Sequence, residues 1–257
     1  MKIILKKIFH ILGYKLHKLS SEKLDLWPSS SKNPQTVYEI EKDFHIAYNE
    51  AMIKTEMIKT DNPLRRNRHY LLSKLIKEAP ISDGEVSECG CWKGLSAYII
   101  AAELKKRNYK NKFYIFDSFE GLSKLDKQDK IKDKNNFDEN EIRKYFAYSL
   151  DRVKKNLEEF KDMMVIYKGW IPSTFKEVEK KAFSFVHIDV DLYQPILDSF
   201  NFFWSKMAKG GIILFDDYGS VSFPGAKLAV DEFLKNINKN EYLFVPLSFG
   251  SAIIVKK

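Results

Sequence analysis

The stretch from residue 184 to residue 219 constrains the fold most. Two short apolar runs, Ser184–Ile188 and Gly211–Phe215, have the length and composition of buried strands. The residues between them carry apolar side chains at helical spacing, with Pro195 in the first turn and Gly210 at the end. The sequence therefore predicts a strand–helix–strand unit, whose two strands should be parallel with a right-handed crossover.

Each of these predicted strands ends in a pair of acids. Asp189 and Asp191 follow the first strand, and Asp216 and Asp217 follow the second. The carboxyl ends of parallel strands meet at one edge of a sheet, where open α/β sheets bind ligands. Carboxylates gathered there repel one another unless a cation lies among them, and oxygen ligands favour magnesium, with calcium or manganese as alternatives. For any single acid, the alternative interpretation is a turn former or a helix cap.

The length and composition of the chain fit a folded α/β protein. Its 257 residues allow one large domain with an extension, or at most two small domains, and a 44% hydrophobic content is enough for a sizeable core. The net charge of +8 favours an anionic partner, such as an acidic substrate, a nucleotide-linked sugar or a membrane face. No sequence signature indicates nucleic acid. The only cysteines, Cys89 and Cys91, exclude a disulfide framework and indicate a reducing compartment, so we expect a cytoplasmic protein.

The first 35 residues are predicted to form a basic amphipathic helix followed by a linker. Apolar residues from Ile4 to Leu19 recur at helical spacing among lysines, and residues 20–35 are polar and rich in Ser and Pro. No apolar run approaches the roughly 18 residues that a membrane span needs. The helix suits peripheral contact with an anionic inner membrane surface. Packing on the body of the protein, or on a second subunit of a homo-oligomer, is the alternative.

The rest of the chain divides into a helical N-terminal extension, residues 36–84, and an α/β domain, residues 85–257. In this domain short apolar strands alternate with helices, and the chain closes in a hairpin that turns at Phe249-Gly250. This order predicts a doubly wound, Rossmann-like sheet that is mostly parallel, with the last strand antiparallel. The further strands are expected at residues 85–88, 113–116 and 164–167.

Residues 121–160 interrupt this alternation after the second strand. A highly charged segment leads into a stretch from Ile142 to Phe160, whose apolar residues have the spacing of one amphipathic helix. An insertion at the carboxyl edge of the sheet is placed to form a lid over the site, and a solvated surface excursion is the alternative.

The loop after the first strand of the domain has features of a nucleoside site. Gly90 and Gly94 let a ligand approach the backbone near the N-terminus of a helix. The loop is not GxGxxG, so it suits a dinucleotide poorly, while Asp117 ends the second strand, where an acid usually binds the hydroxyl pair of a ribose. Together with the strand-end acids, these residues predict a nucleoside cofactor without phosphates beside a metal that holds a second substrate.

Four motifs carry a resemblance to a known family: ExGxWxGxS at Glu88–Ser96, DSFEGL at Asp117–Leu122, HIDVDLY at His187–Tyr193, and GGIILFDDYG followed by GAKLAVDEF. In this order they resemble the macrocin O-methyltransferase family, which methylates sugar hydroxyls of antibiotics. The resemblance covers roughly residues 50–257. It implies a class I methyltransferase fold, S-adenosylmethionine as donor and magnesium as activator.

The resemblance also implies roles for residues of the donor site. The first loop would hold the methionine part of the donor, Asp117 and Ser118 would bind the ribose, and Gly169 and Trp170 would lie near the adenine. The loop residues to which this role is transferred are Glu88, Gly90, Trp92, Lys93, Gly94 and Ser96.

The strand-end acids match the metal acids of the family. Asp191, Asp216 and Asp217 are the matching positions, and Asp189 is either a further metal ligand or orients the sulfonium side of the donor. Methyl transfer to a sugar hydroxyl requires that the hydroxyl loses its proton, and we expect Asp191 to accept it. His187 precedes the strand end and is predicted to face the core instead.

These observations predict a magnesium-dependent O-methyltransferase that uses S-adenosylmethionine. The expected acceptor is a small-molecule sugar, nucleotide sugar or glycan, either a surface polysaccharide precursor or a glycosylated metabolite. Two alternatives remain at this stage. Asp189-Val190-Asp191 is also the D-x-D of a metal-dependent glycosyltransferase, and a non-catalytic nucleotide-binding module would need only the glycine loop and Asp117.

Overall fold

The N-terminal part of the chain forms a small hairpin in the structure, which is a computed structural model. The structure describes residues 14–19, 23–28, 41–129, 138–247 and 250–257. The chain separates into two compact units, Met1–Lys42 and Asp43–Lys257. In the first unit, strands β1 (Tyr14–Leu19) and β2 (Lys23–Pro28) pair antiparallel.

This hairpin differs from the predicted N-terminal helix and linker. The helix was expected to continue to Leu19, and that expectation is wrong for residues 14–19, which form a strand. The linker expected at residues 20–35 contains a second strand. Leu24, Asp25 and Leu26 alternate with the period of a strand, and a short amphipathic run does not by itself distinguish the two periods. The first 13 residues of the predicted helix lie outside the described residues.

The second unit is built on a seven-stranded sheet with the order β5-β4-β3-β6-β7-β9-β8. Strands β3 to β7 are mutually parallel, and β9 is antiparallel to both of its neighbours. This confirms the doubly wound sheet with an antiparallel last strand. The strands are β3 (Glu85–Cys89), β4 (Phe113–Asp117), β5 (Met164–Lys168), β6 (Phe183–Ile188), β7 (Met207–Phe215), β8 (Tyr242–Pro246) and β9 (Ala252–Lys256).

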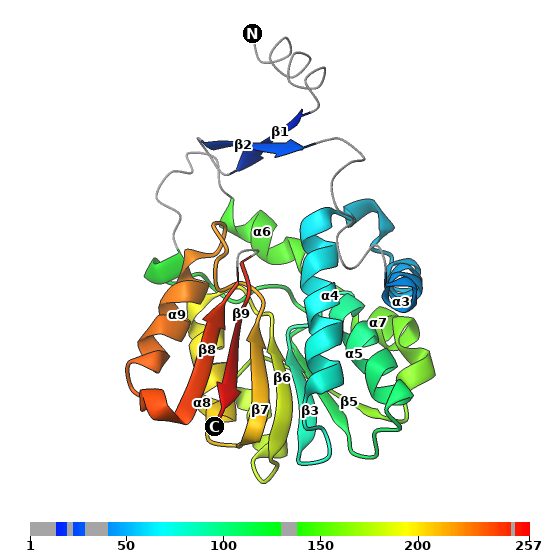
Figure 1. The fold of residues 1–257 in the computed structure, drawn as a ribbon, viewed down its shortest axis with the longest axis vertical. Coiled ribbons are helices and arrows are strands. Elements are labelled where there is room, and N and C mark those ends of the chain that lie inside the picture. Colours follow the sequence, from blue (N-terminus) through cyan, green and yellow to red (C-terminus); the bar gives the residue numbers. More distant parts are fainter. Residues whose placement is uncertain (1–13, 20–22, 29–40, 130–137, 248–249) are drawn as a thin grey trace. The chain divides into compact units, whose positions relative to one another are not determined.

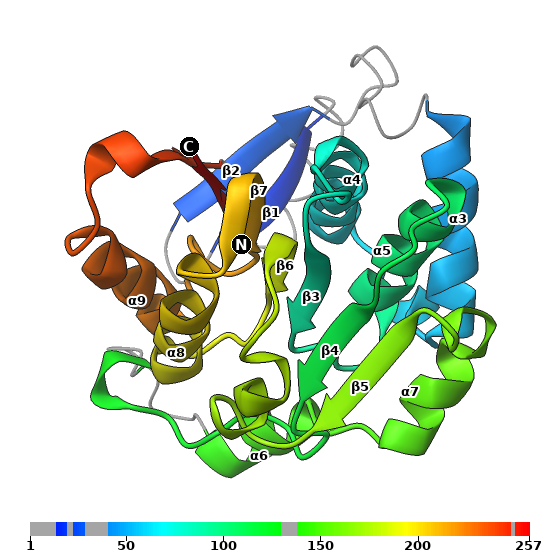
Figure 2. The same cartoon turned by 90° about the horizontal axis from the view of Figure 1, so that it is seen from below.

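Helices cover both faces of this sheet (Figure 2), with α8 and α9 on one face and α4 and α5 on the other. The apolar face predicted for the helix after the first acid pair is confirmed, because Ile196, Phe200 and Phe203 of α8 are buried in the core. None of the helices in the described residues is long and apolar enough to cross a bilayer. The helices of the two layers, with that of the extension, are α3 (Lys42–Lys54), α4 (Pro63–Glu78), α5 (Leu95–Lys106), α8 (Tyr193–Trp204) and α9 (Pro224–Leu234).

The insertion does not contain the single helix that its spacing predicted. It forms two short helices, α6 (Glu139–Tyr145) and α7 (Leu150–Asn156), and the chain leaves the helical path at Phe146. The ring of Phe146 packs against Trp92, with ring centroids 5.6 Å apart. This tertiary contact overrides a local helical preference that is worth only fractions of a kcal/mol per residue. Figure 1 shows α6 beyond the carboxyl ends of the parallel strands, where a lid was expected.

The beginning of the insertion is fixed to the body of the domain by a buried acid. Asp129 Oδ1 accepts a hydrogen bond from the backbone N–H of Tyr193, at the start of α8, over 2.8 Å. Asp129 Oδ2 accepts one from the N–H of Asp126 over 3.0 Å. Gly225 of α9 faces the same carboxylate, and a Cβ atom at Gly225 would lie 1.9 Å from Asp129 Oδ1. The insertion is therefore held in a position that admits only a glycine at residue 225.

Replacing Gly225 by Ala is expected to lower the free energy of unfolding by about 1–3 kcal/mol, the usual cost of overpacking a well-packed site. Neighbouring atoms cannot easily give way, because Tyr193 Cβ would also lie 2.9 Å from the new methyl group. Urea unfolding measures the change. Leu228→Ala on the exposed side of α9 is the control and should change stability by no more than about 0.5 kcal/mol. Equal stability of Gly225→Ala and the wild type would contradict the contact.

Candidate functional site

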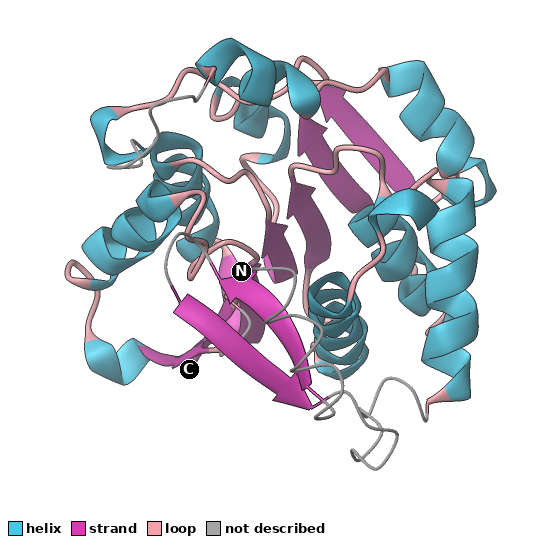
Figure 3. Cartoon of the chain, turned by 90° about the horizontal axis from the view of Figure 1, so that it is seen from above, coloured by secondary structure: helices cyan, strands magenta, loops and turns pink. Residues whose placement is uncertain are grey.

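The register of three neighbouring strands brings the candidate site together. Cys89 of β3 lies opposite Ile188 of β6, and Ile188 lies opposite Phe215 of β7. The pairing continues one residue further, because Asp189 N–H donates to Cys89 C=O over 2.9 Å and Asp216 N–H donates to Ile188 C=O over 3.0 Å. The acids that follow β6 and β7 are therefore side by side at the carboxyl edge. Figure 3 looks onto this edge, where the connecting loops gather.

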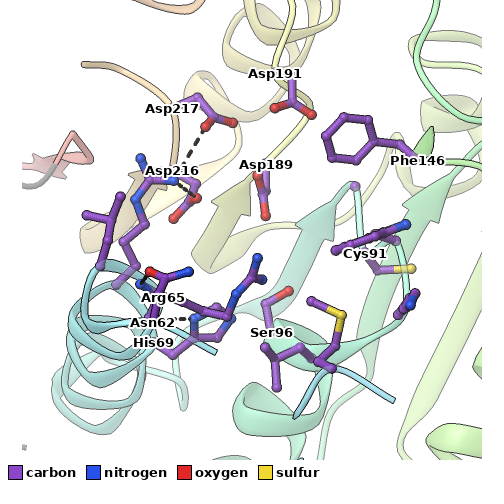
Figure 4. Close-up of a pocket in the computed structure, with 17 residues that line it drawn as sticks. Asn62, Arg65, His69, Cys91, Ser96, Phe146, Asp189, Asp191, Asp216 and Asp217 are labelled. Atoms are coloured by element: carbon purple, nitrogen blue, oxygen red, sulfur yellow. Dashed lines mark hydrogen bonds and ion pairs between the residues drawn. The ribbon is translucent and has the colours of Figure 1, made fainter. Parts of the chain in front are cut away.

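Three of the four predicted metal acids form a tight cluster (Figure 4). Asp189, Asp216 and Asp217 each offer a carboxylate oxygen, and these oxygens lie within 4.8 Å of one another. Among the described residues, this is the group of acids that could hold a metal ion, and Asp191 is not part of it. The backbone of Asp191 has φ of 58°, a left-handed conformation in which the chain turns sharply after β6.

Arg68 of α4 supplies a positive charge to the cluster. Its Nη1 donates a hydrogen bond to Asp216 Oδ2 over 2.6 Å and lies 3.5 Å from Asp217 Oδ1. On the opposite side, His187 Nε2 lies 4.0 Å from Asp216 Oδ1, which is the separation of an ion pair and too long for a hydrogen bond. Asp216 is thus held between a guanidinium group and an imidazole.

The charges of the four acids differ because their surroundings differ. Burial and the neighbouring charges of Asp216 and Asp217 raise the pKa of Asp189 well above its usual range, and burial with the charge of Asp217 does the same for Asp191. Burial and the charge of Asp216 raise the pKa of Asp217 to about 6. Burial also acts on Asp216, but His187 and Arg68 outweigh it and lower the pKa of this carboxyl.

The cluster fits a hard divalent cation. Asp217 Oδ2 is buried and has no hydrogen-bond partner among the described residues. Burial and the neighbouring carboxylates raise the pKa values of Asp189 and Asp217 although Arg68 acts in the opposite direction, and a bound cation would oppose both causes. All of the available ligand atoms are oxygens, which suit magnesium, calcium or manganese better than zinc. The chemistry of the donor set therefore agrees with a resident divalent cation.

Two cavities meet beside this cluster. The larger cavity, of about 310 Å³, extends from the loop after β3 towards β4, β5 and the start of α8. The second, of about 210 Å³, lies between the strand ends and α4, and we call it the acid cavity because all four strand-end acids line it. Both cavities are lined by Gly90, Trp92, Phe146, Asp189 and Asp191. A group bound in one cavity can therefore reach a group bound in the other.

The larger cavity contains most of the predicted donor residues. Gly90, Trp92, Asp117, Ser118, Gly169 and Trp170 line it. Asp117 is held by the backbone, since Oδ2 accepts hydrogen bonds from the N–H groups of Cys91 (2.8 Å) and Trp92 (3.0 Å), and Oδ1 accepts one from Phe119 (2.7 Å). Each carboxylate oxygen has two lone pairs, so Asp117 keeps acceptor capacity for a ligand. The Ser118 hydroxyl is already used, because it donates to Gly121 C=O over 2.9 Å.

Other residues predicted for the donor loop lie elsewhere. Lys93 and Ser96 line the acid cavity. Glu88 lines neither cavity: it is fully buried within β3, and its Oε1 accepts a hydrogen bond from His187 Nδ1 over 2.8 Å. Gly94 also lines neither, since a Cβ atom there would meet Leu157 at 3.3 Å. The physical reason is position, because Glu88 stands before the strand end and Gly94 packs against Leu157 at the end of α7.

The site contains charged and aromatic residues that the sequence did not predict. Arg68 and His69 reach the acid cavity from α4, and Phe146 reaches both cavities from the insertion. Arg65, Arg68 and His69 follow the i, i+3, i+4 spacing of one helix face, which was the available signal for Arg68. Burial lowers the pKa of His69 to about 4, so this imidazole is neutral near pH 7. The expectation that His187 faces the core is confirmed by its burial.

The fold and the paired cavities define a class I methyltransferase architecture. The solved structure of the O-methyltransferase NovP has a TM-score of 0.60 and 19% identity, covering 74% of this chain and 79% of that chain. An O-methyltransferase from Bacillus cereus in complex with SAH has a TM-score of 0.57 and 14% identity, covering 86% of this chain and 95% of that chain. Residues 65–244 match the macrocin-O-methyltransferase (TylF) family, and the chain belongs to this family.

Curated relatives match part of the chain in sequence. The "8-demethyl-8-(2,3-dimethoxy-alpha-L-rhamnosyl)-tetracenomycin-C 4'-O-methyltransferase" of Streptomyces olivaceus is 24% identical over 139 residues, which cover 52% of this chain and 53% of the relative. The chain spans between half and three-fifths of the length of the curated relatives it matches. The resemblance expected from the motifs is thus confirmed at the level of the family.

Proposed function

We propose that this protein is an S-adenosylmethionine-dependent, magnesium-dependent O-methyltransferase that acts on a sugar hydroxyl. The observation that carries the proposal is the junction of the two cavities at Asp189 and Asp191, beside a cluster of three acids. A donor in the larger cavity and an acceptor in the acid cavity would meet at this junction. The name of the Streptomyces olivaceus relative describes methylation of a rhamnosyl group, which supports a sugar as acceptor.

The larger cavity would position the donor through groups that the protein has already oriented. Asp117, whose carboxylate is held by three backbone N–H groups, would accept a hydrogen bond from a ribose hydroxyl at the remaining acceptor position of Oδ1. Trp170 is 40% exposed and offers an apolar surface beside which the adenine would lie. Binding both reactants in fixed orientation lowers the entropic part of the barrier to an in-line displacement.

The acid cavity would bind the acceptor and take its proton. A magnesium ion bound by Asp189, Asp216 and Asp217 would lower the pKa of an acceptor hydroxyl and stabilise negative charge on its oxygen. Asp191 lies outside this ligand set and lines both cavities, so it is placed to accept the hydroxyl proton. Phe146 also lines both cavities and would exclude water from the junction.

Incubation with radiolabelled S-adenosylmethionine and a panel of acceptors tests the proposal. The panel contains nucleotide sugars, glycosylated metabolites and fragments of surface polysaccharides. We expect label in at least one sugar product, loss of transfer with EDTA, and recovery on addition of magnesium, since the acid cluster needs a cation. Full activity in EDTA would refute the metal part of the proposal, and label in no sugar would refute the acceptor class.

The glycosyltransferase alternative makes a different prediction for binding. A glycosyltransferase would need only the two acids of its D-x-D, whereas here Asp189 shares a cluster with Asp216 and Asp217 of the next strand. Calorimetry with S-adenosylhomocysteine and with UDP-sugars separates the two functions. We expect S-adenosylhomocysteine to bind in the absence of an acceptor. Cytoplasmic location, and contact of the N-terminal residues with an inner membrane or a second subunit, stay predictions.

A further inference from the structure

Arg65 of α4 lines the acid cavity, where the segment that precedes the helix holds it. Asn62 caps α4, and its Oδ1 accepts a hydrogen bond from the N–H of Arg65 over 2.9 Å. Arg65 Nε donates to Thr60 C=O over 3.1 Å. The guanidinium group is thus fixed through one of its five N–H donors. The remaining donors sit on the two Nη atoms, in the planar fork that matches a carboxylate.

The positive charge of Arg65 differs from those of its neighbours along the helix. Arg66 forms an ion pair with Asp61, and Arg68 forms one with Asp216. Within the described ranges, Arg65 forms no ion pair with a carboxylate, although its side chain is partly buried. Arg65 lines the acid cavity, and its guanidinium group has no acidic partner there among the residues that the structure describes. A guanidinium group in this position can bind an anionic ligand.

The surroundings of Arg65 in the acid cavity favour an anion on this side. Lys93 adds a second positive charge, and Ser96 adds a hydroxyl in the first turn of α5. The N-terminal end of this 12-residue helix carries the positive end of its dipole. Figure 4 shows Asn62, Arg65 and His69 at the α4 wall and the strand-end acids at another wall of the pocket. A bound anion would therefore avoid the carboxylates.

We propose that Arg65, with Lys93 and the start of α5, forms a subsite that binds a carboxylate group. This inference rests on the proposed function, which supplies two possible sources of the carboxylate. One source is the methionine part of the donor, and the other is an acidic group on the acceptor sugar. The two sources share their chemistry, a planar pair of oxygens that accepts two parallel N–H donors, and the experiment separates them.

The test compares two ligands that differ in the amino-acid part alone. S-adenosylhomocysteine carries the carboxylate, and 5'-methylthioadenosine has the same nucleoside and thioether without it. In Arg65→Gln, we expect the affinity for S-adenosylhomocysteine to fall about 10–100-fold, the loss typical of hydrogen bonds to a charged group, while the affinity for 5'-methylthioadenosine is unchanged. Calorimetry measures both. Lys77→Gln removes a positive charge from the exposed last turn of the same helix and is the control.

The second arm tests the acceptor as the source. If Arg65→Gln binds both nucleoside ligands as the wild type does, KM is measured for a neutral sugar acceptor and for its uronate counterpart. An increase in KM of about 10-fold or more for the uronate alone assigns the carboxylate to the acceptor. Unchanged affinities together with unchanged KM values overturn the subsite.

Failure of the subsite and failure of the proposed function give different results. If the wild type itself binds neither S-adenosylhomocysteine nor 5'-methylthioadenosine, the donor assignment fails, whatever Arg65 does. Thermal unfolding shows whether Arg65→Gln folds. If it does not fold, Arg65→Met, which keeps the aliphatic stem packed against α4, takes its place in the same two comparisons with the same expected ratios.

Discussion

Replacing Asp191 by Asn is expected to lower kcat for methyl transfer by about 10²–10⁴-fold, the contribution of a positioned general base. The substitution removes the proton acceptor at the junction of the two cavities and keeps the shape of the side chain. Asn is also among the few residues that tolerate a positive φ, so the sharp turn at residue 191 should persist. Single-turnover kinetics with labelled donor measure the rate.

Two binding measurements make this prediction specific to the chemical step. Asp191→Asn should bind S-adenosylhomocysteine and manganese as the wild type does, because Asp191 lies outside the three-acid cluster. Asp162→Asn, at an exposed residue, is the matched control and should keep the full rate. If Asp191→Asn transfers methyl groups at the wild-type rate, another group accepts the proton. If it instead fails to bind manganese, Asp191 is a metal ligand.

Replacing Asp217 by Asn is expected to stabilise the metal-free protein at pH 8, by at most about 3 kcal/mol. Burial and the charge of Asp216 raise the pKa of Asp217 from 3.8 to about 6 in the folded state. A carboxyl whose folded pKa is raised favours the folded state below its unfolded pKa and loses this contribution as the pH rises through the folded value. The stability of the two proteins should therefore be similar near pH 4 and should differ above pH 6.

The same substitution should have the opposite effect when a divalent cation is present. Magnesium or manganese binds the folded state and should raise the unfolding temperature of the wild type. Asp217→Asn loses one of three ligands and should lose most of this increase. Thermal unfolding at pH 8 in EDTA, and then with manganese, measures both effects. An Asp217→Asn protein that is less stable than the wild type in EDTA would show that Asp217 contributes a favourable contact in the absence of metal.

Much of the sheet and of the acid site could be predicted from the sequence. Buried parallel strands are short, continuous apolar runs, so β3, β4, β5 and β6 could be located to within a residue or two. The position of Asp189 and Asp216 follows from the same pattern, because a parallel sheet aligns its carboxyl ends. Strand β7 was less well predicted: it begins at Met207 rather than Gly211, since Met207 pairs with Phe183 of β6.

The insertion, and the contact between the helical N-terminal extension and the strand-end acids, were predicted less well, for a different reason. The apolar spacing from Ile142 to Phe160 fits one helix, yet Phe146 leaves the helical path to contact Trp92. Arg68 was not recognised as a site residue, because the sequence of an amphipathic helix does not show which acid a charged side chain will contact. Its contact with Asp216 joins residues 148 positions apart in the chain. Periodicity describes which face of an element is apolar, and it does not identify the segment that covers that face.

By itself, the sequence determined the strand–helix–strand unit, the antiparallel last strand and the meeting of two acid pairs at one sheet edge. These features depend on local periodicity and on the handedness of parallel connections, which every L-peptide chain shares. Only the tertiary structure showed which three acids form the tight cluster, brought Arg68 to Asp216 and placed Phe146 at the wall of both cavities. Those outcomes depend on contacts between distant segments, whose energies are decided by packing and burial rather than by neighbours in the chain.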